Sequence, residues 1–433
     1  MTTSWDGLAP ARPAVHLTPP TGWMNDPNGL CYVDGHWHAF YQHNPNDIVW
    51  GPMHWGHASS ADLVSWDHHP VALSPNEQGT IFSGSAVIDH DNTAGFGAGA
   101  LVAMFTQDLE GLQRQSIAAS LDGGLTWSVS PSNPVLEIDA IDCRDPKVLA
   151  MDDGDPRRWA MVLAVGDRVH FYRSADLKHW NLEGEFTWDL EADGVWECPD
   201  LMRLPGSDPG WLLTFCVTNA GPHGHSASLA VPGNFNGVRF EPSSTPAPVD
   251  FGPDFYAMQS FHAAPTDNPV VMGWMNSWRY SNSHPSNGWR GVQSLPRLLS
   301  LADDGQLLTA PAVDLVTRSS PFHGSAWSSE PDTAIYVRAD DSMRAEIEGD
   351  KGLVATIEIT SQSASITRQG EVVEGYAQRY EAELTQGGIH QIIIDHGTIE
   401  VFAAGGQASL SALTFPGEEW HVRVDGQAEI RLL

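Results

Sequence analysis

The sequence contains few cysteines and no long hydrophobic run. Its 433 residues include four cysteines, and no two of them form a CxxC pair. The pattern indicates neither a zinc knuckle nor a dense disulfide framework, so we expect free thiols. No apolar run approaches the roughly 18 residues that a membrane helix needs, and the first residues lack the basic and apolar regions of a secretion signal. We therefore expect a soluble, cytoplasmic protein.

Positive charge is also scarce. Lysine and arginine together number 22, against 54 aspartates and glutamates, which gives a formal net charge of −32. Such a charge repels nucleic acid and anionic membranes. We therefore expect no partner of either kind, and the sequence leaves open whether the protein is a monomer or a homodimer.

Familiar catalytic motifs are missing as well. The sequence has no GxSxG elbow, no HExxH helix, no GxGxxG turn and no GxxxxGK[ST] loop. Histidine is frequent, with 19 copies and several close pairs, but no third ligand follows at a spacing that suits zinc. We predict neither a metal site nor a bound cofactor.

Glycine, proline and tryptophan, by contrast, are abundant, with 41, 30 and 17 copies. This mixture is typical of many short strands joined by turns, with aromatic rings available to stack on flat ligands. Residues 30–42 form two alternating stretches around Asp34-Gly35, and residues 159–174 repeat that pattern around Gly166-Asp167. Long amphipathic helices are almost absent, so we expect an all-β protein.

A short motif recurs three times along the chain, as SADLVSW at 60–66, SLDGGLTW at 120–127 and SADLKHW at 174–180. Each copy has a serine, an aspartate two residues later, and a tryptophan four or five residues after that. The tryptophans lie 61 and 53 residues apart, which is about the length of one four-stranded sheet. We therefore predict a β-propeller, with room for five blades between residues 20 and 310.

The character of the sequence changes after residue 310. Residues 316–333 are rich in serine, proline and charge, and are predicted to be a linker. Beyond them, stretches such as LVATIEIT, QIIIDHGTIEVFA and EWHVRV alternate over short lengths, as the strands of a sandwich do. We thus assign residues 1–315 to a five-bladed propeller, 316–333 to a linker and 334–433 to a β-sandwich.

Three carboxylates stand in unusual surroundings: Asp26 in WMNDPNG, Asp145 in CRDPKV and Glu197 in WECPDL. The plain alternatives are a surface turn for Asp26 and an ion pair with Arg144 for Asp145. The apolar neighbours of Glu197 are expected to raise its pKa, whereas the asparagines around Asp26 are expected to keep it ionised. Two carboxyl groups that differ in this way are what the cleavage of a glycosidic bond requires.

The blocks around these carboxylates, WMNDPNG, RDP at 144–146 and EC at 197–198, resemble the signature blocks of glycoside hydrolase family 32, which contains invertases, levanases, inulinases and fructan exohydrolases. The likeness extends over nearly the whole chain. Further segments that resemble the family, in the same order, are FYQHNP, WGPMHWGHA, FSGSAV, DFYAMQSF, GWRGVQSLPR and, in the second domain, DHGTIEVF.

The resemblance implies a role for each carboxylate. Asp26 would be the nucleophile that attacks the anomeric carbon of a fructofuranosyl unit, and Glu197 the general acid that later activates water. Asp145 would stabilise the transition state by holding two sugar hydroxyls, with Arg144 holding its carboxylate in place. Other positions that match the fructose pocket of the family are Asn25, Gln42, Trp50, Phe82, Ser83, Arg144, Cys198 and Trp274.

The implied reaction is the release of fructose from the non-reducing ends of sucrose, fructo-oligosaccharides, levan or inulin, with retention of configuration. Retention predicts that the carboxyl groups of Asp26 and Glu197 lie about 5 to 5.5 Å apart. Three alternatives stay open: a fructosyltransferase that uses the same residues, a non-catalytic fructan-binding protein, and an inverting five-bladed enzyme that acts on arabinans. The sequence does not rank sucrose, levan and inulin as substrates.

Overall fold

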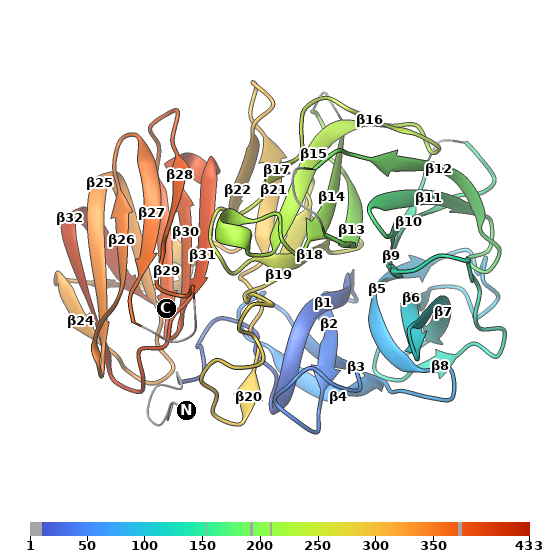
Figure 1. The fold of residues 1–433 in the computed structure, drawn as a ribbon, viewed down its shortest axis with the longest axis horizontal. Coiled ribbons are helices and arrows are strands. Elements are labelled where there is room, and N and C mark those ends of the chain that lie inside the picture. Colours follow the sequence, from blue (N-terminus) through green and yellow to red (C-terminus); the bar gives the residue numbers. More distant parts are fainter. Residues whose placement is uncertain (1–10, 153, 191–193, 208–209, 371–374) are drawn as a thin grey trace.

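The computed structural model describes residues 11–433 except 153, 191–193, 208–209 and 371–374. Five sheets of the N-terminal part form a ring, and the strands of the C-terminal part pack against one side of it (Figure 1). The predicted fold, an all-β chain with a five-bladed propeller followed by a sandwich, is confirmed.

The blades follow one another along the chain. The first contains β1 (Gly22–Val33), β2 (His36–Asn44), β3 (His54–Ser60), β4 (Asp67–Leu73) and the short β20 (Trp289–Arg290). The second contains β5 (Thr80–Asp89), β6 (Ala100–Leu109), β7 (Leu112–Ser120) and β8 (Ser128–Val129). The third contains β9 (Cys143–Ala150), β10 (Trp159–Val165), β11 (Arg168–Ser174) and β12 (Asn181–Thr187).

The last two blades are less regular. The fourth contains β13 (Trp196–Arg203), β14 (Trp211–Val217), β15 (Ala227–Phe235), β16 (Phe240–Pro242) and β17 (Ala247–Pro248), with the turn η1 (Pro222–Gly224) between β14 and β15. The fifth contains β18 (Tyr256–Ser260), β19 (Val270–Trp274), β21 (Arg297–Leu301) and β22 (Leu307–Pro311). Between β19 and β21, the strand β20 leaves this blade and pairs in parallel with β1.

The innermost strands of the blades are β1, β5, β9, β13 and β18. Each contacts the inner strands of both neighbouring blades, and β18 returns to β1 to close the ring. An isolated bridge between Cys31 and His262 adds to this closure. One end of each inner strand is thereby brought to a common axis, which is where ligands of propellers bind.

The repeated serine–aspartate–tryptophan motif forms the turn from the third strand of a blade to the outermost one. In the first blade, Ser60 donates to Asp62 (3.0 Å), whose carboxylate accepts the N–H groups of residues 64 and 65. The pairs Ser120–Asp122 and Ser174–Asp176 make the same contact in the next two blades (2.7 and 3.2 Å). The motif therefore marks one fixed point of each of these blades.

The C-terminal strands form the sandwich around an apolar core. They are β23 (Ser320–Phe322), β24 (Ala326–Ser328), β25 (Ile335–Gly349), β26 (Gly352–Ile359), β27 (Ser363–Arg368), β28 (Arg379–Glu383), β29 (His390–Asp395), β30 (Thr398–Ala403), β31 (Ala408–Leu413) and β32 (Trp420–Leu432), with the turn η2 (Ala404–Gly406) before β31. The first half of β25 pairs with β29 and its second half with β26, while β32 pairs along both halves.

The segment predicted to be a linker is instead structured. Residues 316–333 contain most of the helix α1 (Leu315–Arg318) and both β23 and β24, and these two strands pair with β32. The sequence shows no sign of these two strands, because their pairing partner lies about a hundred residues further along the chain. In the part of the chain that the structure describes, no helix has the length and apolarity to span a membrane.

Candidate active site

Each inner strand carries a β-bulge at the same level of the ring. From Met24 to Pro27 the chain advances three residues in β1, while the partner strand β2 advances two, from His43 to Tyr41. The same shift recurs in the four other inner strands, at residues 81–84, 144–147, 197–200 and 256–259. A bulge turns side chains away from the regular ladder. The motifs WMNDPNG, FSGSAV, RDP, EC and DFYAMQSF all coincide with these bulges.

Three of the bulges hold a non-glycine residue in the left-handed region. The φ angles are 64° at Asp145, 46° at Cys198 and 53° at Ala257. Such backbone conformations cost free energy, and they cluster at functional sites because the surrounding structure must enforce them.

Asp26 lies at the bulge of β1 and accepts three hydrogen bonds. The donors are Asn25 Nδ2 (2.9 Å), Ser83 Oγ (2.6 Å) and Cys198 Sγ (3.6 Å). Asn25 is in turn fixed by Trp23, whose Nε1 donates to its side-chain oxygen (2.7 Å). The sequence predicts that amides keep Asp26 ionised, but burial raises the pKa of Asp26 in spite of these donors.

Asp145 lies beside Asp26, with Cys198 between them. The Oδ2 atom of Asp145 accepts both the backbone N–H (2.9 Å) and the Sγ (3.5 Å) of Cys198. Burial and the nearby charge of Asp26 raise the pKa of Asp145 to about 7. Cys198 therefore touches both carboxylates from below the pocket.

Arg144 does not hold Asp145 as the resemblance implies. Within the described residues Arg144 makes no hydrogen bond or ion pair with Asp145. Its Nε donates to Glu197 Oε1 (3.1 Å), and its Nη1 donates to Asp142 (2.8 Å) and Gln113 (3.1 Å). Successive residues of a strand point to opposite faces, so Arg144 reaches across to the next blade while Asp145 turns into the bulge.

Glu197 is held by two donors from two different blades. Besides Arg144, Tyr256 Oη donates to Glu197 Oε2 (2.5 Å). The Glu197 side chain keeps 19% of its surface exposed, on the side of the pocket. Burial raises the pKa of Glu197, while Arg144 and Tyr256 oppose this change. The predicted direction is confirmed.

The three carboxylates line one open pocket of about 360 Å³. It contains most of the positions that the sequence singles out. The described residues that line it are Asn25, Asp26, Gln42, Trp50, Phe82, Ser83, Gln113, Asp142, Arg144, Asp145, Glu197 and Trp278. Within the described residues, no group of three or more histidines, cysteines or carboxylates is arranged to hold a metal ion.

Trp274, which the sequence places among the pocket residues, does not line the pocket in the structure. Its side chain is fully buried against Trp23 (6.0 Å between ring centroids) and Trp278 (4.9 Å). Trp278, in the loop after β19, covers it and reaches the pocket itself. Trp50 and Phe82 supply two further rings of the rim, 5.9 Å apart.

Four residues of the site were missed by sequence reasoning: Gln113, Asp142, Tyr256 and Trp278. Asp142 stands next to the CRDPKV block and Tyr256 lies inside DFYAMQSF, so both had a signal in the chain. Gln113 lies on β7, the third strand of its blade, and no motif marks it.

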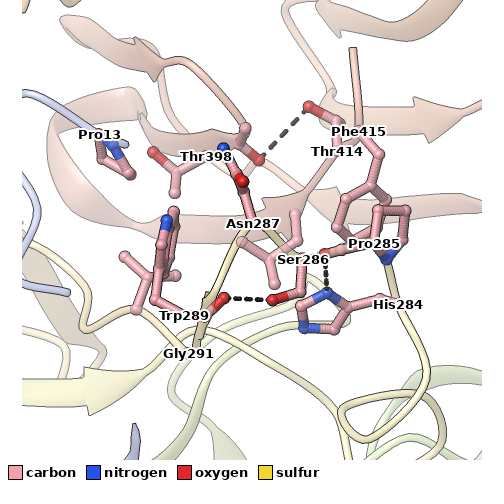
Figure 2. Close-up of a pocket in the computed structure, with 13 residues that line it drawn as sticks. Pro13, His284, Pro285, Ser286, Asn287, Trp289, Gly291, Thr398, Thr414 and Phe415 are labelled. Atoms are coloured by element: carbon pink, nitrogen blue, oxygen red, sulfur yellow. Dashed lines mark hydrogen bonds between the residues drawn. The ribbon is translucent and has the colours of Figure 1, made fainter. Parts of the chain in front are cut away.

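A second, smaller cavity lies where the propeller meets the sandwich (Figure 2). It has a volume of about 30 Å³, and Trp289, Val292, Leu413 and Phe415 supply much of its apolar wall. None of the thirteen residues that line it is a carboxylate. The chemistry that the sequence predicts thus gathers in the central pocket and not at this junction.

Comparison with known families agrees with this geometry. The family model described as "Glycosyl hydrolases family 32 N-terminal domain" matches residues 16–311. These residues comprise the ring of blades and the short segment that precedes β1. The chain belongs to glycosyl hydrolase family 32. Among curated members, the levanase of Bacillus subtilis is 47% identical over 304 residues, which cover 67% of this chain and 45% of the levanase. The chain therefore spans less than half the length of that relative.

Solved structures of family 32 extend the likeness to the sandwich. The exo-inulinase of Aspergillus awamori superposes with a TM-score of 0.84 at 29% identity, over 99% of both chains. The fructofuranosidase of Schwanniomyces occidentalis in complex with fructose superposes with a TM-score of 0.82 at 27% identity, again over 99% of both chains.

Proposed function

We propose that this protein is a retaining β-fructofuranosidase that releases fructose from the non-reducing ends of fructosides. One observation carries the proposal: Asp26, Asp145 and Glu197, from three different blades, line one pocket, and each accepts hydrogen bonds from donors that orient it. The similarity to a levanase and to an exo-inulinase supports the same substrate class.

The first step would join the sugar to Asp26. A carboxylate oxygen of Asp26 attacks the anomeric carbon, and the bond from that carbon to the leaving oxygen breaks. Glu197 gives its proton to the leaving oxygen, so that the alcohol departs neutral. The donors Asn25 and Ser83 fix the direction of the Asp26 carboxylate for this attack.

The second step would return Asp26 to its starting state. Glu197, now ionised and paired with Arg144 and Tyr256, takes a proton from water, and the water oxygen attacks the same carbon. The bond from that carbon to Asp26 breaks, so that fructose leaves and the Asp26 carboxylate is restored. Asp145 would accept hydrogen bonds from hydroxyl groups of the sugar ring, and the hydrogen bond from the Cys198 N–H orients its carboxylate. Two inversions give overall retention.

The buried surroundings of the carboxylates support attack at chain ends. One buried cluster includes Trp23, Cys198, Tyr256 and Trp274. Cys198 of this cluster contacts Asp26 and Asp145, and Tyr256 contacts Glu197. A fructan would not thread through this cluster, so only a terminal unit would enter. The rim residues Trp50, Phe82 and Trp278 would then face the leaving part of the substrate.

The products formed early in the reaction test this proposal. Sucrose, levan and inulin are incubated with the protein, and the products are separated by chromatography. We expect free fructose first from at least one of them, and proton NMR of the fresh product should show the β-anomer. Oligosaccharides ahead of fructose would indicate internal cleavage or transfer, and no turnover of any of the three would overturn the proposal.

A further inference from the structure

Residues 291–297, which lead into β21 of the fifth blade, lie between the nucleophile and the sandwich. Gln293 is fully buried in this segment. Its backbone N–H donates to the carbonyl of Leu17 (2.8 Å), and its side-chain Nε2 donates to the carbonyl of Asn25 (2.5 Å). The segment also lies close to β1, because a Cβ atom on Gly291 would be 1.9 Å from the carbonyl oxygen of Met24.

The hydrogen bond from Gln293 falls on the part of β1 that its neighbouring strand leaves unpaired. The register between β1 and β2 passes from Met24 directly to Pro27, so Asn25 and Asp26 lie in the bulge. The carbonyl of Asn25 and the N–H of Asp26 belong to one planar peptide unit. By fixing that carbonyl, Gln293 also fixes the orientation of the peptide plane that joins Asn25 to Asp26.

The sandwich holds this segment through a buried carboxylate. Glu400 on β30 accepts the backbone N–H of Leu295 at its Oε1 (2.7 Å) and Arg297 Nε at its Oε2 (3.0 Å). The side chains of both Glu400 and Arg297 have no exposed surface. Leu295 is two residues from Gln293, so the sandwich anchors the segment directly beside the contact with Asn25.

A histidine from the start of the chain joins the same cluster. His16, also without exposed side-chain surface, contacts Glu400 Oε1 (3.0 Å) and Asp395 Oδ2 (2.7 Å). It precedes Leu17, whose carbonyl receives the N–H of Gln293. Glu400 thus restrains Gln293 along two routes, through Leu295 and through the segment of His16.

We propose that Gln293 and Glu400 are positioning residues for the nucleophile, so that the sandwich is a working part of the active site. This inference rests on the proposed function, because it assigns the two residues to the orientation of Asp26. The chain of contacts runs from Glu400 through Leu295 to Gln293, and from there through Asn25 to Asp26.

The test uses full-length variants that each change one buried side chain. Gln293→Met keeps an unbranched side chain of similar length and removes the donor to Asn25. Glu400→Gln keeps the shape of the side chain, but it replaces one acceptor oxygen by an NH2 donor and removes the charge, so the contacts with Leu295, Arg297 and His16 cannot all be kept. Tyr376→Phe is the matched control, because it removes a buried hydrogen bond of the sandwich, to the Leu413 carbonyl (3.1 Å), without a link to Asn25.

We expect kcat for fructose release to fall on the order of ten- to a hundredfold in Gln293→Met, with KM changed by less than about threefold. Glu400→Gln should show the same split, and Tyr376→Phe should keep the wild-type kcat. A folded Gln293→Met variant with kcat within about twofold of wild type would overturn the inference. So would an equal loss of kcat in the control.

Hydrogen exchange gives a second readout that does not need turnover. Amides of residues 22–33 should exchange faster in Gln293→Met than in wild type or in Tyr376→Phe. If wild type releases no fructose, the proposed function fails, and the exchange experiment still decides whether Gln293 holds the strand. If Glu400→Gln does not fold, Gln293→Met decides the inference alone, and unchanged exchange there would contradict it.

Discussion

Burial disfavours the charged form of all three carboxyl groups of the site, Asp26, Asp145 and Glu197. Burial raises the pKa of each of them, and the charge of Asp26 adds to the rise at both other carboxyls. Their roles are therefore set by partners and not by burial. Asp26 receives neutral donors, whereas Glu197 faces the guanidinium of Arg144 and the hydroxyl of Tyr256.

Replacement of Asp26, the proposed nucleophile, should abolish turnover without unfolding the protein. Asp26→Asn keeps the shape of the side chain and loses the nucleophilic oxygen, so we expect kcat to fall on the order of ten-thousandfold. Thermal unfolding should stay close to that of wild type. A variant that unfolds normally and keeps more than about a tenth of the wild-type rate would show that another group attacks.

The alkaline limit of activity should report the proton on Glu197. The first step needs the protonated acid, so activity falls as pH rises through the pKa of Glu197. The hydrogen bond from Tyr256 favours the anion and so lowers the pKa of Glu197. Tyr256→Phe should therefore move the alkaline limb of kcat/KM to higher pH, and Glu197→Gln should abolish that limb. A limb that moves to lower pH in Tyr256→Phe would contradict this assignment.

The bulges determine which side chains of each inner strand reach the pocket. Gly291 is the point where the segment before β21 comes closest to the bulge of β1, with φ at +100° and no space for a Cβ atom. We expect Gly291→Ala to destabilise the protein by about 2 to 4 kcal/mol, through backbone strain and the clash with Met24. Chemical denaturation measures this loss.

Gly288 offers a matched control in the same loop. Its φ is +76°, and a Cβ atom there would meet nothing within 4 Å. Gly288→Ala should therefore cost about 1 kcal/mol, from strain alone. An equal cost for both variants would mean that the close approach to Met24 carries no free energy.

The sequence predicts the blades better than the bulges. The serine–aspartate–tryptophan turns repeat locally, so each copy can be read from a short window, and the spacing of the copies over the length of the chain gives the number of blades. The bulges depend on the register between strands, so the motif alone does not predict which side chains face the pocket or which partners they contact. This is why the partner of Arg144 was misjudged, and why Trp274 was expected in the position that Trp278 takes. The strands β23 and β24 were missed because they are short and pair with the distant β32.

At the scale of the molecule, buried charges join the propeller to the sandwich. Although burial lowers the pKa of His16, hydrogen bonds to Asp395 and Glu400 raise it to about 9, above its ordinary value of about 6.5. A raised pKa stabilises the folded state fully below the ordinary value, and this stabilisation is lost as pH rises through the folded value. His16 in turn keeps the pKa of Asp395 low in spite of burial, and Arg297 together with His16 does the same for the pKa of Glu400.

Stability should therefore decline on the alkaline side between about pH 6.5 and 9. Unfolding temperatures measured from pH 5 to 10 test this expectation. His16→Gln should lower stability by about 3 to 5 kcal/mol near neutral pH, because the buried Asp395 loses its cation and Glu400 keeps only Arg297. The variant should also flatten the alkaline decline. A decline of unchanged shape in the variant would assign the titration to another group.

Closure of the ring between the first and the last blade has a consequence for the order of events during folding. The nucleophile is on the first blade, but β20 and Gln293, which hold it, come more than 260 residues later in the chain. A chain with four completed blades would carry all three carboxylates and still lack a working arrangement of them. Such distant contacts form late, since a long loop must close first. In refolding experiments, recovery of fructose release should lag behind recovery of tryptophan fluorescence. The rate at which activity recovers would then report the rate at which the fifth blade docks on the first.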